Sequence, residues 1–151
     1  MNFRKGFTLI ELLVVISIIV LLGSIILIGV MARVRDAKDE RIIADMGQIR
    51  IEAGIVMATY NSYIPLDCNY GLPDNKEMQM LCNDIDSQDG KTPNTGDVPY
   101  PTFYTSDTEY CVTSELLVDY HGSEDRFCID SHGNAGRTTT GCSGFTCVNL
   151  R

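Results

Sequence analysis

The chain opens with Lys5-Gly6-Phe7-Thr8-Leu9-Ile10-Glu11-Leu12-Leu13-Val14-Val15-Ile16-Ser17-Ile18-Ile19-Val20, and apolar residues continue from there to Ala32. Within the range 7–32 the only ionisable side chain is Glu11. About 20 helical residues, each rising roughly 1.5 Å, are enough to cross the hydrocarbon core of a bilayer. The run therefore predicts a helix that crosses or enters a membrane.

Glu11 is the anomaly in this run. A charged group inside hydrocarbon costs on the order of 2.5–3.5 kcal/mol on insertion scales, so an acid in this setting needs a partner. No cation lies within the apolar run. A cut between Gly6 and Phe7 would create an α-amine on Phe7, four residues before the carboxylate. We expect the pairing between copies of the chain, with Glu11 of one copy meeting the Phe7 amine of another.

These residues closely resemble a known processing motif. Met1 to Gly6 resembles the basic leader of a type IV prepilin, and Gly6-Phe7-Thr8-Leu9-Ile10-Glu11-Leu12 resembles the motif shared by type IV pilins and type II secretion pseudopilins. The resemblance implies cleavage after Gly6 by a prepilin peptidase, methylation of the new Phe7 terminus and an assembly role for Glu11. It also implies an assembly platform and further copies of the chain as partners.

The sequence divides into four expected regions. They are a leader (1–6), a transmembrane and filament-core helix (7–32), an amphipathic helix (33–60) and an extracytoplasmic headpiece (61–151). Arg4 and Lys5 before the apolar run favour a single pass with the N-terminus in the cytoplasm. The basic residues that follow the run argue the opposite way, so the orientation rests partly on the resemblance. We expect an inner-membrane precursor, followed by an extracellular filament on the cell surface.

The helix is predicted to continue past the apolar run, from Leu9 to Tyr60. No proline precedes Pro65, and apolar residues recur at the spacing of a helix with one buried stripe. The stripe comprises Ile42, Ile43, Met46, Ile49, Ala53, Val56, Met57 and Tyr60. The charged residues between Arg33 and Glu52 predict a solvated helix face, with interaction between subunits as the alternative.

The second half predicts an α+β, pilin-like fold. Range 68–104 is rich in Gly and Pro, which favours a long irregular loop with a short helical turn near 76–82. Ranges 109–118 and 126–130 are rich in strand formers, and 131–136 predicts a turn. We expect an antiparallel sheet of about three to four strands, packed on the helix stripe between Met46 and Tyr60.

Six cysteines in a chain that leaves the cytoplasm predict disulfides. They are Cys68, Cys82, Cys111, Cys128, Cys142 and Cys147. Six cysteines permit 15 connectivities, which sequence cannot resolve. Our preferred set joins Cys68 with Cys82, Cys111 with Cys128, and Cys142 with Cys147, because each pair closes a local loop. A zinc site is the alternative, but neither His121 nor His132 has ligand spacing with these cysteines.

No catalytic, cofactor or metal motif emerges. The acidic segment 84–90 resembles the start of a calcium loop, but its glycine is one place late and Thr95 stands at the twelfth position, so a solvated acidic loop is the better interpretation. A net charge of −8 argues against binding nucleic acid. The predicted function is a structural filament subunit. The alternatives are a pseudopilin of a type II secretion or DNA-uptake machine, and a membrane-anchored binding domain that never polymerises.

Overall fold

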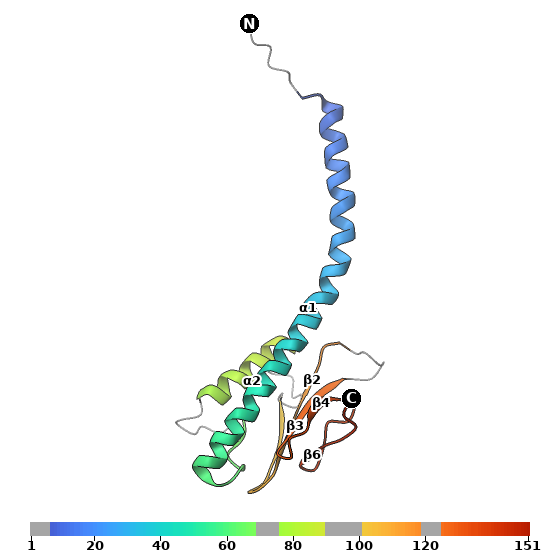
Figure 1. Ribbon diagram of the computed structural model, residues 1–151. Helices are drawn as coiled ribbons and strands as arrows, with labels where there is room; N and C mark the ends of the chain where they lie inside the picture. The colour runs from blue at the N-terminus through green and yellow to red at the C-terminus, as the bar shows by residue number, and fades with distance from the viewer. Residues whose placement is uncertain (1–6, 69–75, 90–100, 119–124) are drawn as a thin grey trace, which may run out of the picture. The chain divides into compact units, whose positions relative to one another are not determined.

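The computed structural model describes residues 7–68, 76–89, 101–118 and 125–151 (Figure 1). Within these ranges the structure contains two helices, followed by a four-stranded sheet and a short hairpin. The elements are α1 (Leu9–Tyr60), α2 (Lys76–Asp89), β1 (Thr102–Thr105), β2 (Tyr110–Glu115), β3 (Arg126–Asp130), β4 (Ala135–Thr138), β5 (Cys142–Ser143) and β6 (Thr146–Cys147). The chain divides into two compact units, Met1–Arg35 and Asp36–Arg151.

Helix α1 has the predicted bounds, Leu9–Tyr60. It ends where Asn61 adopts a φ of 53°, a left-handed conformation that Asn tolerates better than most residues. The Asn61 N–H still donates to the Met57 carbonyl at 2.9 Å, which closes the last turn. The helix therefore ends at a local cap, four residues before Pro65.

The core of the second unit is organised around one stripe of α1. Its buried residues are spaced alternately by four and three, as in a helix with a single buried face. They are Ile42, Met46, Ile49, Ala53 and Val56. The predicted stripe is thus confirmed for these five positions, whereas Tyr60 at its end is 44% exposed.

Both α2 and the sheet contribute to this core. Met78 and Ile85 of α2 are buried in it, as are Val112 of β2 and Ile129 of β3. Burial of each such aliphatic side chain stabilises the fold by about 1.5–3 kcal/mol relative to exposure. The predicted packing of an antiparallel sheet on the helix stripe is confirmed.

The sheet is an antiparallel meander with strand order β1-β2-β3-β4. Strand β3 has its predicted bounds, while β2 is shorter than the predicted 109–118. The turn predicted at 131–136 occupies 131–133, and Ala135 already begins β4.

The prediction of an irregular loop over 68–104 was wrong in two places. Helix α2 covers Lys76–Asp89 and so extends well beyond the short turn predicted near 76–82, and β1 begins at Thr102. Met78, Cys82 and Ile85 lie on one face of α2 and are buried. Tertiary burial of this face outweighs the weak helix propensity of the Asn, Asp and Ser residues around it.

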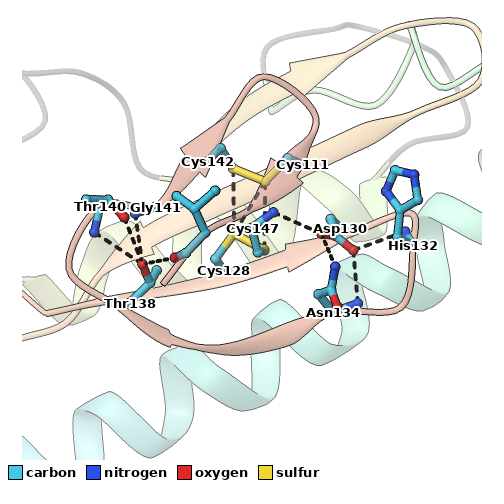
Figure 2. Close-up of a disulfide and its surroundings, with 11 residues drawn as sticks. Cys111, Cys128, Asp130, His132, Asn134, Thr138, Thr140, Gly141, Cys142 and Cys147 are labelled. Atoms are coloured by element: carbon cyan, nitrogen blue, oxygen red, sulfur yellow. Dashed lines mark hydrogen bonds between the residues drawn. A yellow bond between two sulfur atoms is a disulfide. The ribbon is translucent and has the colours of Figure 1, made fainter. Parts of the chain in front are cut away.

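Three disulfides link the six cysteines. Cys68–Cys82 is confirmed, but the other two predicted pairs were wrong. The bonds are Cys111–Cys142 and Cys128–Cys147. All three hold the second unit together, and Figure 2 shows the two that join the hairpin to the sheet.

The register explains the corrected pairing. Cys111 lies opposite Asp130, and Cys128 lies opposite Thr113. The two cysteines are therefore diagonal neighbours on one face of the sheet, with their sulfurs 3.3 Å apart. Each bonds instead to the β5–β6 hairpin, in which Cys142 and Cys147 are directly opposite each other. The two disulfides consequently join the hairpin to the sheet.

Candidate functional site

The start of α1 is fixed by Thr8. Its hydroxyl oxygen accepts the backbone N–H of Glu11 at 3.3 Å, and its carbonyl accepts the N–H groups of Glu11 and Leu12 at 3.1 and 3.3 Å. The hydroxyl also donates to Glu11 Oε2 at 3.4 Å. Thr8 thus caps the helix as the Thr of a Thr-x-x-Glu capping-box sequence does, while the Glu11 carboxylate accepts the Thr8 hydroxyl and lies in the first turn, near the positive end of the helix.

Glu11 was predicted to lack a local partner, and Thr8 was not among the predicted site residues. The signal was present, because a Ser or Thr three residues before a Glu, directly ahead of an apolar run, is typical of a helix N-terminus. Glu11 thus has a local role within one chain, in addition to the assembly role that the resemblance implies. Gly6 lies outside the described residues, so cleavage after it stays a prediction.

Apolar side chains cover every side of the first part of α1. Phe7 and Leu9 are each 81% exposed, Val15 is 46% exposed, and Val20 is 70% exposed. An ordinary surface helix has one apolar stripe, whereas a helix that is apolar all round belongs to the interior of an assembly or a membrane. No helical stretch among the described residues is both long and apolar enough to qualify as a membrane span.

The solvated face predicted for the charges of α1 is confirmed for Asp36 and Glu40, which are exposed, but was wrong for Asp39 and Asp45, which are buried. Asp39 is buried, and its carboxylate accepts the backbone N–H groups of Leu117 and Val118 at 2.7 and 3.2 Å. Burial raises its pKa, and these hydrogen bonds oppose the rise only in part. Asp39 therefore fixes the chain directly after β2.

The acidic segment that begins at Asp84 was predicted to be a solvated loop, and this was wrong. Its residues 84–89 form the last turns of α2. The Asp84 carboxylate accepts Arg41 Nε at 2.7 Å and Nη2 at 3.0 Å. This two-point ion pair joins α2 to α1. The segment is therefore helical and does not have the conformation of a calcium-binding loop.

Another carboxylate, that of Asp130, lies at the junction of sheet and hairpin (Figure 2). Its Oδ1 accepts the backbone N–H groups of His132 and Asn134 at 3.0 and 2.9 Å. Its Oδ2 accepts the Asn134 side-chain amide at 2.8 Å and the Cys147 N–H at 2.9 Å. Burial raises the pKa of Asp130, but these donors together outweigh burial and leave its pKa below the ordinary value.

Thr138 plays a similar part on β4. Its hydroxyl donates to the Val148 carbonyl at 2.6 Å and accepts the backbone N–H groups of Thr140 and Gly141, each at 3.2 Å. Figure 2 shows this hydroxyl inside the loop that leads into the hairpin. Polar side chains and disulfides therefore hold the C-terminal hairpin together.

The sulfurs of Cys111, Cys128 and Cys147 lie within 4.8 Å of one another, which is close enough to hold a metal ion. Each is committed to a disulfide, and a metal requires thiolate ligands. His121 lies outside the described residues, and His132 pairs with the Glu109 carboxylate at 3.3 Å. The role of these cysteines is therefore structural, as disulfides that join the hairpin to the sheet.

Comparison with known proteins gives one match. Residues 1–31 match the family described as the prokaryotic N-terminal methylation motif. No curated protein and no solved structure matches the chain. The match covers the segment that holds Gly6, Phe7, Thr8 and Glu11.

Proposed function

The N-terminal methylation motif indicates the type IV pilin and pseudopilin family, and on that premise we propose that this chain is a structural subunit of a type IV pilus-like filament. The precursor is inserted in the inner membrane, cleaved after Gly6, methylated on Phe7 and polymerised through its N-terminal helix. The observation that carries the proposal is the combination of this motif with an α1 segment that exposes apolar side chains on every side.

The exposed apolar surface needs a cover both before and after assembly. In the precursor the lipid of the inner membrane provides it, because the full apolar run of the sequence, from Phe7 to Ala32, exceeds the roughly 20 helical residues needed to cross the hydrocarbon core, although the described part of α1 alone does not qualify as a span. In the filament the same segments of neighbouring subunits pack against one another. The segment then exchanges one apolar environment for another, so extraction from the membrane does not expose it to water.

Glu11 provides the specific contact in this scheme. Cleavage after Gly6 turns Phe7 into a terminus with a cationic amine, close to the carboxylate in the first turn of α1. In an apolar surrounding an acid and an amine each carry a desolvation cost, and the cost falls when they pair. Pairing between neighbouring copies therefore couples processing to polymerisation, since the uncut precursor has no amine at this position.

The second unit suits the exposed part of such a filament. Its core is closed by a sheet packed on α1 and by three disulfides, and the full chain is acidic, with a net charge of −8. Disulfides form and persist in oxidising compartments outside the cytoplasm, where a small domain gains most from them. An acidic surface also keeps the filament soluble and makes non-specific binding to nucleic acid unfavourable.

Mass spectrometry of the protein from sheared surface filaments and from membranes tests the proposal. We expect the filament form to begin at a methylated Phe7 and the membrane pool to contain precursor that still carries residues 1–6. The matched control is Gly6→Val, which places a branched side chain at the cleavage site and should leave only precursor in the membrane. A mature protein with another N-terminus, or filaments built from the uncut precursor, would overturn the proposal.

A further inference from the structure

Helices α1 and α2 meet along a groove of about 510 Å³ that is lined mainly by acids. From α1 come Asp45, Gln48 and Glu52, and from α2 come Glu77, Met80, Leu81 and Asp84. On each helix the two acids are seven residues apart, which is about two turns. They form two opposed pairs, Asp45 with Asp84 and Glu52 with Glu77.

One of these acids has an unusual setting. Asp45 is only 7% exposed, and its Oδ2 is buried without a hydrogen-bond donor among the described residues. A buried polar atom left unpaired costs about 1–3 kcal/mol, and more when it is charged. The group that faces Asp45 across the groove is Asp84, another acceptor when both are ionised. Only a proton on one of the two turns this contact into a hydrogen bond.

Arg41 decides which acid carries the proton. Its guanidinium binds both oxygens of Asp84, at 2.7 and 3.0 Å, and so holds Asp84 in the ionised form. The pKa of Asp84 is accordingly lowered, chiefly by this hydrogen bond. Asp45 is therefore the proton carrier, and burial followed by the contact with Asp84 raises its pKa to about 6.

We propose that Asp45, protonated, donates a hydrogen bond to Asp84 across the α1–α2 groove, so that this helix contact is a pH-sensitive joint that tightens in acid and loosens near neutrality. Among the described residues, the charged groups that act on Asp45 are Arg41 of α1 and Asp84 of α2, and the groove also holds Glu52 of α1 and Glu77 of α2. The Glu52–Glu77 pair works in the same direction, because burial and the opposed acid both favour protonation of Glu52.

The direction in which pH changes the stability of this contact follows from the linkage between protonation and folding. A folded-state pKa above the unfolded value of about 3.9 means that the folded chain binds the proton more tightly. The contribution to stability is fully present below about pH 4 and is lost as the pH rises through about 6. Cys68–Cys82 still tethers α2 at neutral pH, so the change stays local to the helix contact.

Asp45→Asn tests the proposal, because the neutral amide has the size of the protonated acid and can donate to Asp84 at any pH. Full-length protein in a mild detergent with EDTA would be compared at pH 5.0 and 7.5 by thermal unfolding and by amide hydrogen exchange. For the wild type we expect a higher melting temperature at pH 5.0, and protection factors in α2, corrected for the intrinsic pH dependence of amide exchange, higher on the order of tenfold than at pH 7.5. Strands β2 and β3 are the internal reference for exchange.

The variant should lose most of the pH response, keeping only the part that the Glu52–Glu77 pair contributes, and should melt above the wild type at pH 7.5. Asp86→Asn is the matched control, because it makes the same exchange on α2 at a residue that does not line the groove. It should retain the wild-type response. The proposal is overturned if Asp45→Asn keeps the full response, if it melts below the wild type at pH 7.5, or if Asp86→Asn abolishes the response equally well.

Discussion

Asp130 on β3 accepts the backbone N–H of Cys147 on β6 at 2.9 Å, directly beside the disulfide that joins Cys147 to Cys128 on the same two strands. The covalent bond fixes how far apart the strands can move, and the hydrogen bond fixes their register. Because Oδ1 of the same carboxylate holds the turn after β3, one side chain links three segments (Figure 2).

Asp130→Asn should destabilise the headpiece by about 1–3 kcal/mol, because an amide nitrogen replaces one acceptor oxygen and leaves at least one buried donor unpaired. Chemical denaturation of the full-length protein in detergent, with disulfides intact, measures the change. Asp107→Asn is the control. Asp107 is exposed and accepts a single hydrogen bond, from the Ser62 hydroxyl at 2.9 Å, so the change there should stay within about 0.5 kcal/mol. Equal losses of stability in both variants would contradict the role of Asp130 as a buried acceptor that holds the hairpin to the sheet.

The same carboxylate predicts a response to acid. The pKa of Asp130 lies below its ordinary value, so its contribution to stability is present above the unfolded pKa of about 3.9 and is lost as the pH falls through the folded value. We expect the wild type to lose more stability than Asp130→Asn as the pH falls below about 4. Parallel acid titrations of the two proteins would refute the linkage.

The corrected disulfides carry a prediction of their own. Non-reducing digestion followed by mass spectrometry should recover peptides joined through Cys111–Cys142 and Cys128–Cys147. In the chain-entropy account a link spanning 31 residues contributes about 4 kcal/mol, against about 3 kcal/mol for the Cys68–Cys82 link spanning 14. Replacing Cys111 and Cys142 by Ala should therefore cost somewhat more than replacing Cys68 and Cys82. Recovery of Cys111 joined to Cys128 would contradict the structure.

The long helix was predictable from sequence because its determinants are local. An apolar run, the absence of proline before Pro65 and the regular spacing from Ile42 to Val56 each act over a few turns. The type and bounds of β3 followed from strand formers in the same way. Only the start of helix α2 was predicted, as a short turn near 76–82. Its full length was missed because Met78, Cys82 and Ile85 are the only buried apolar residues in this polar helix, and what they pack against lies elsewhere in the chain.

At the candidate sites too, contacts between residues close in sequence were predictable and contacts between distant residues were not. Thr8 and Glu11 form a motif within four residues, so their pairing could have been found in the sequence. Asp39 is different, since its donors Leu117 and Val118 lie 78 and 79 residues away. The cysteine pairing likewise depended on the strand register and on the position of the hairpin, and local spacing carries neither. Long-range hydrogen bonds to buried carboxylates thus required the fold itself.

Asn61 ends α1 in a left-handed conformation, with a φ of 53°. Asn61→Ala should destabilise the protein by about 1–2 kcal/mol, because a β-carbon without a compensating polar group is disfavoured there. Asn61→Gly should be neutral or slightly stabilising. Asn83→Ala on the exposed side of α2 is the matched control, and it should not be destabilising. Thermal unfolding ranks the three variants, and an Asn61→Ala protein as stable as the wild type would show that the cap contributes nothing.

Glu11 has two separable roles, the local cap with Thr8 and the proposed pairing with a neighbour's Phe7 amine, and substitutions distinguish them. Gln is as good as Glu in a capping box, so Glu11→Gln preserves the cap but removes the charge. Removing one charge from a buried ion pair costs about 3–5 kcal/mol, which exceeds the roughly 1.4 kcal/mol that corresponds to a tenfold change. We expect Glu11→Gln to reduce filament incorporation at least tenfold, measured by immunoblot of sheared and membrane fractions. Thr8→Ala, which removes the cap hydroxyl and keeps the charge, should still assemble. If Glu11→Gln assembles normally while Thr8→Ala does not, the carboxylate serves the helix and not the subunit contact.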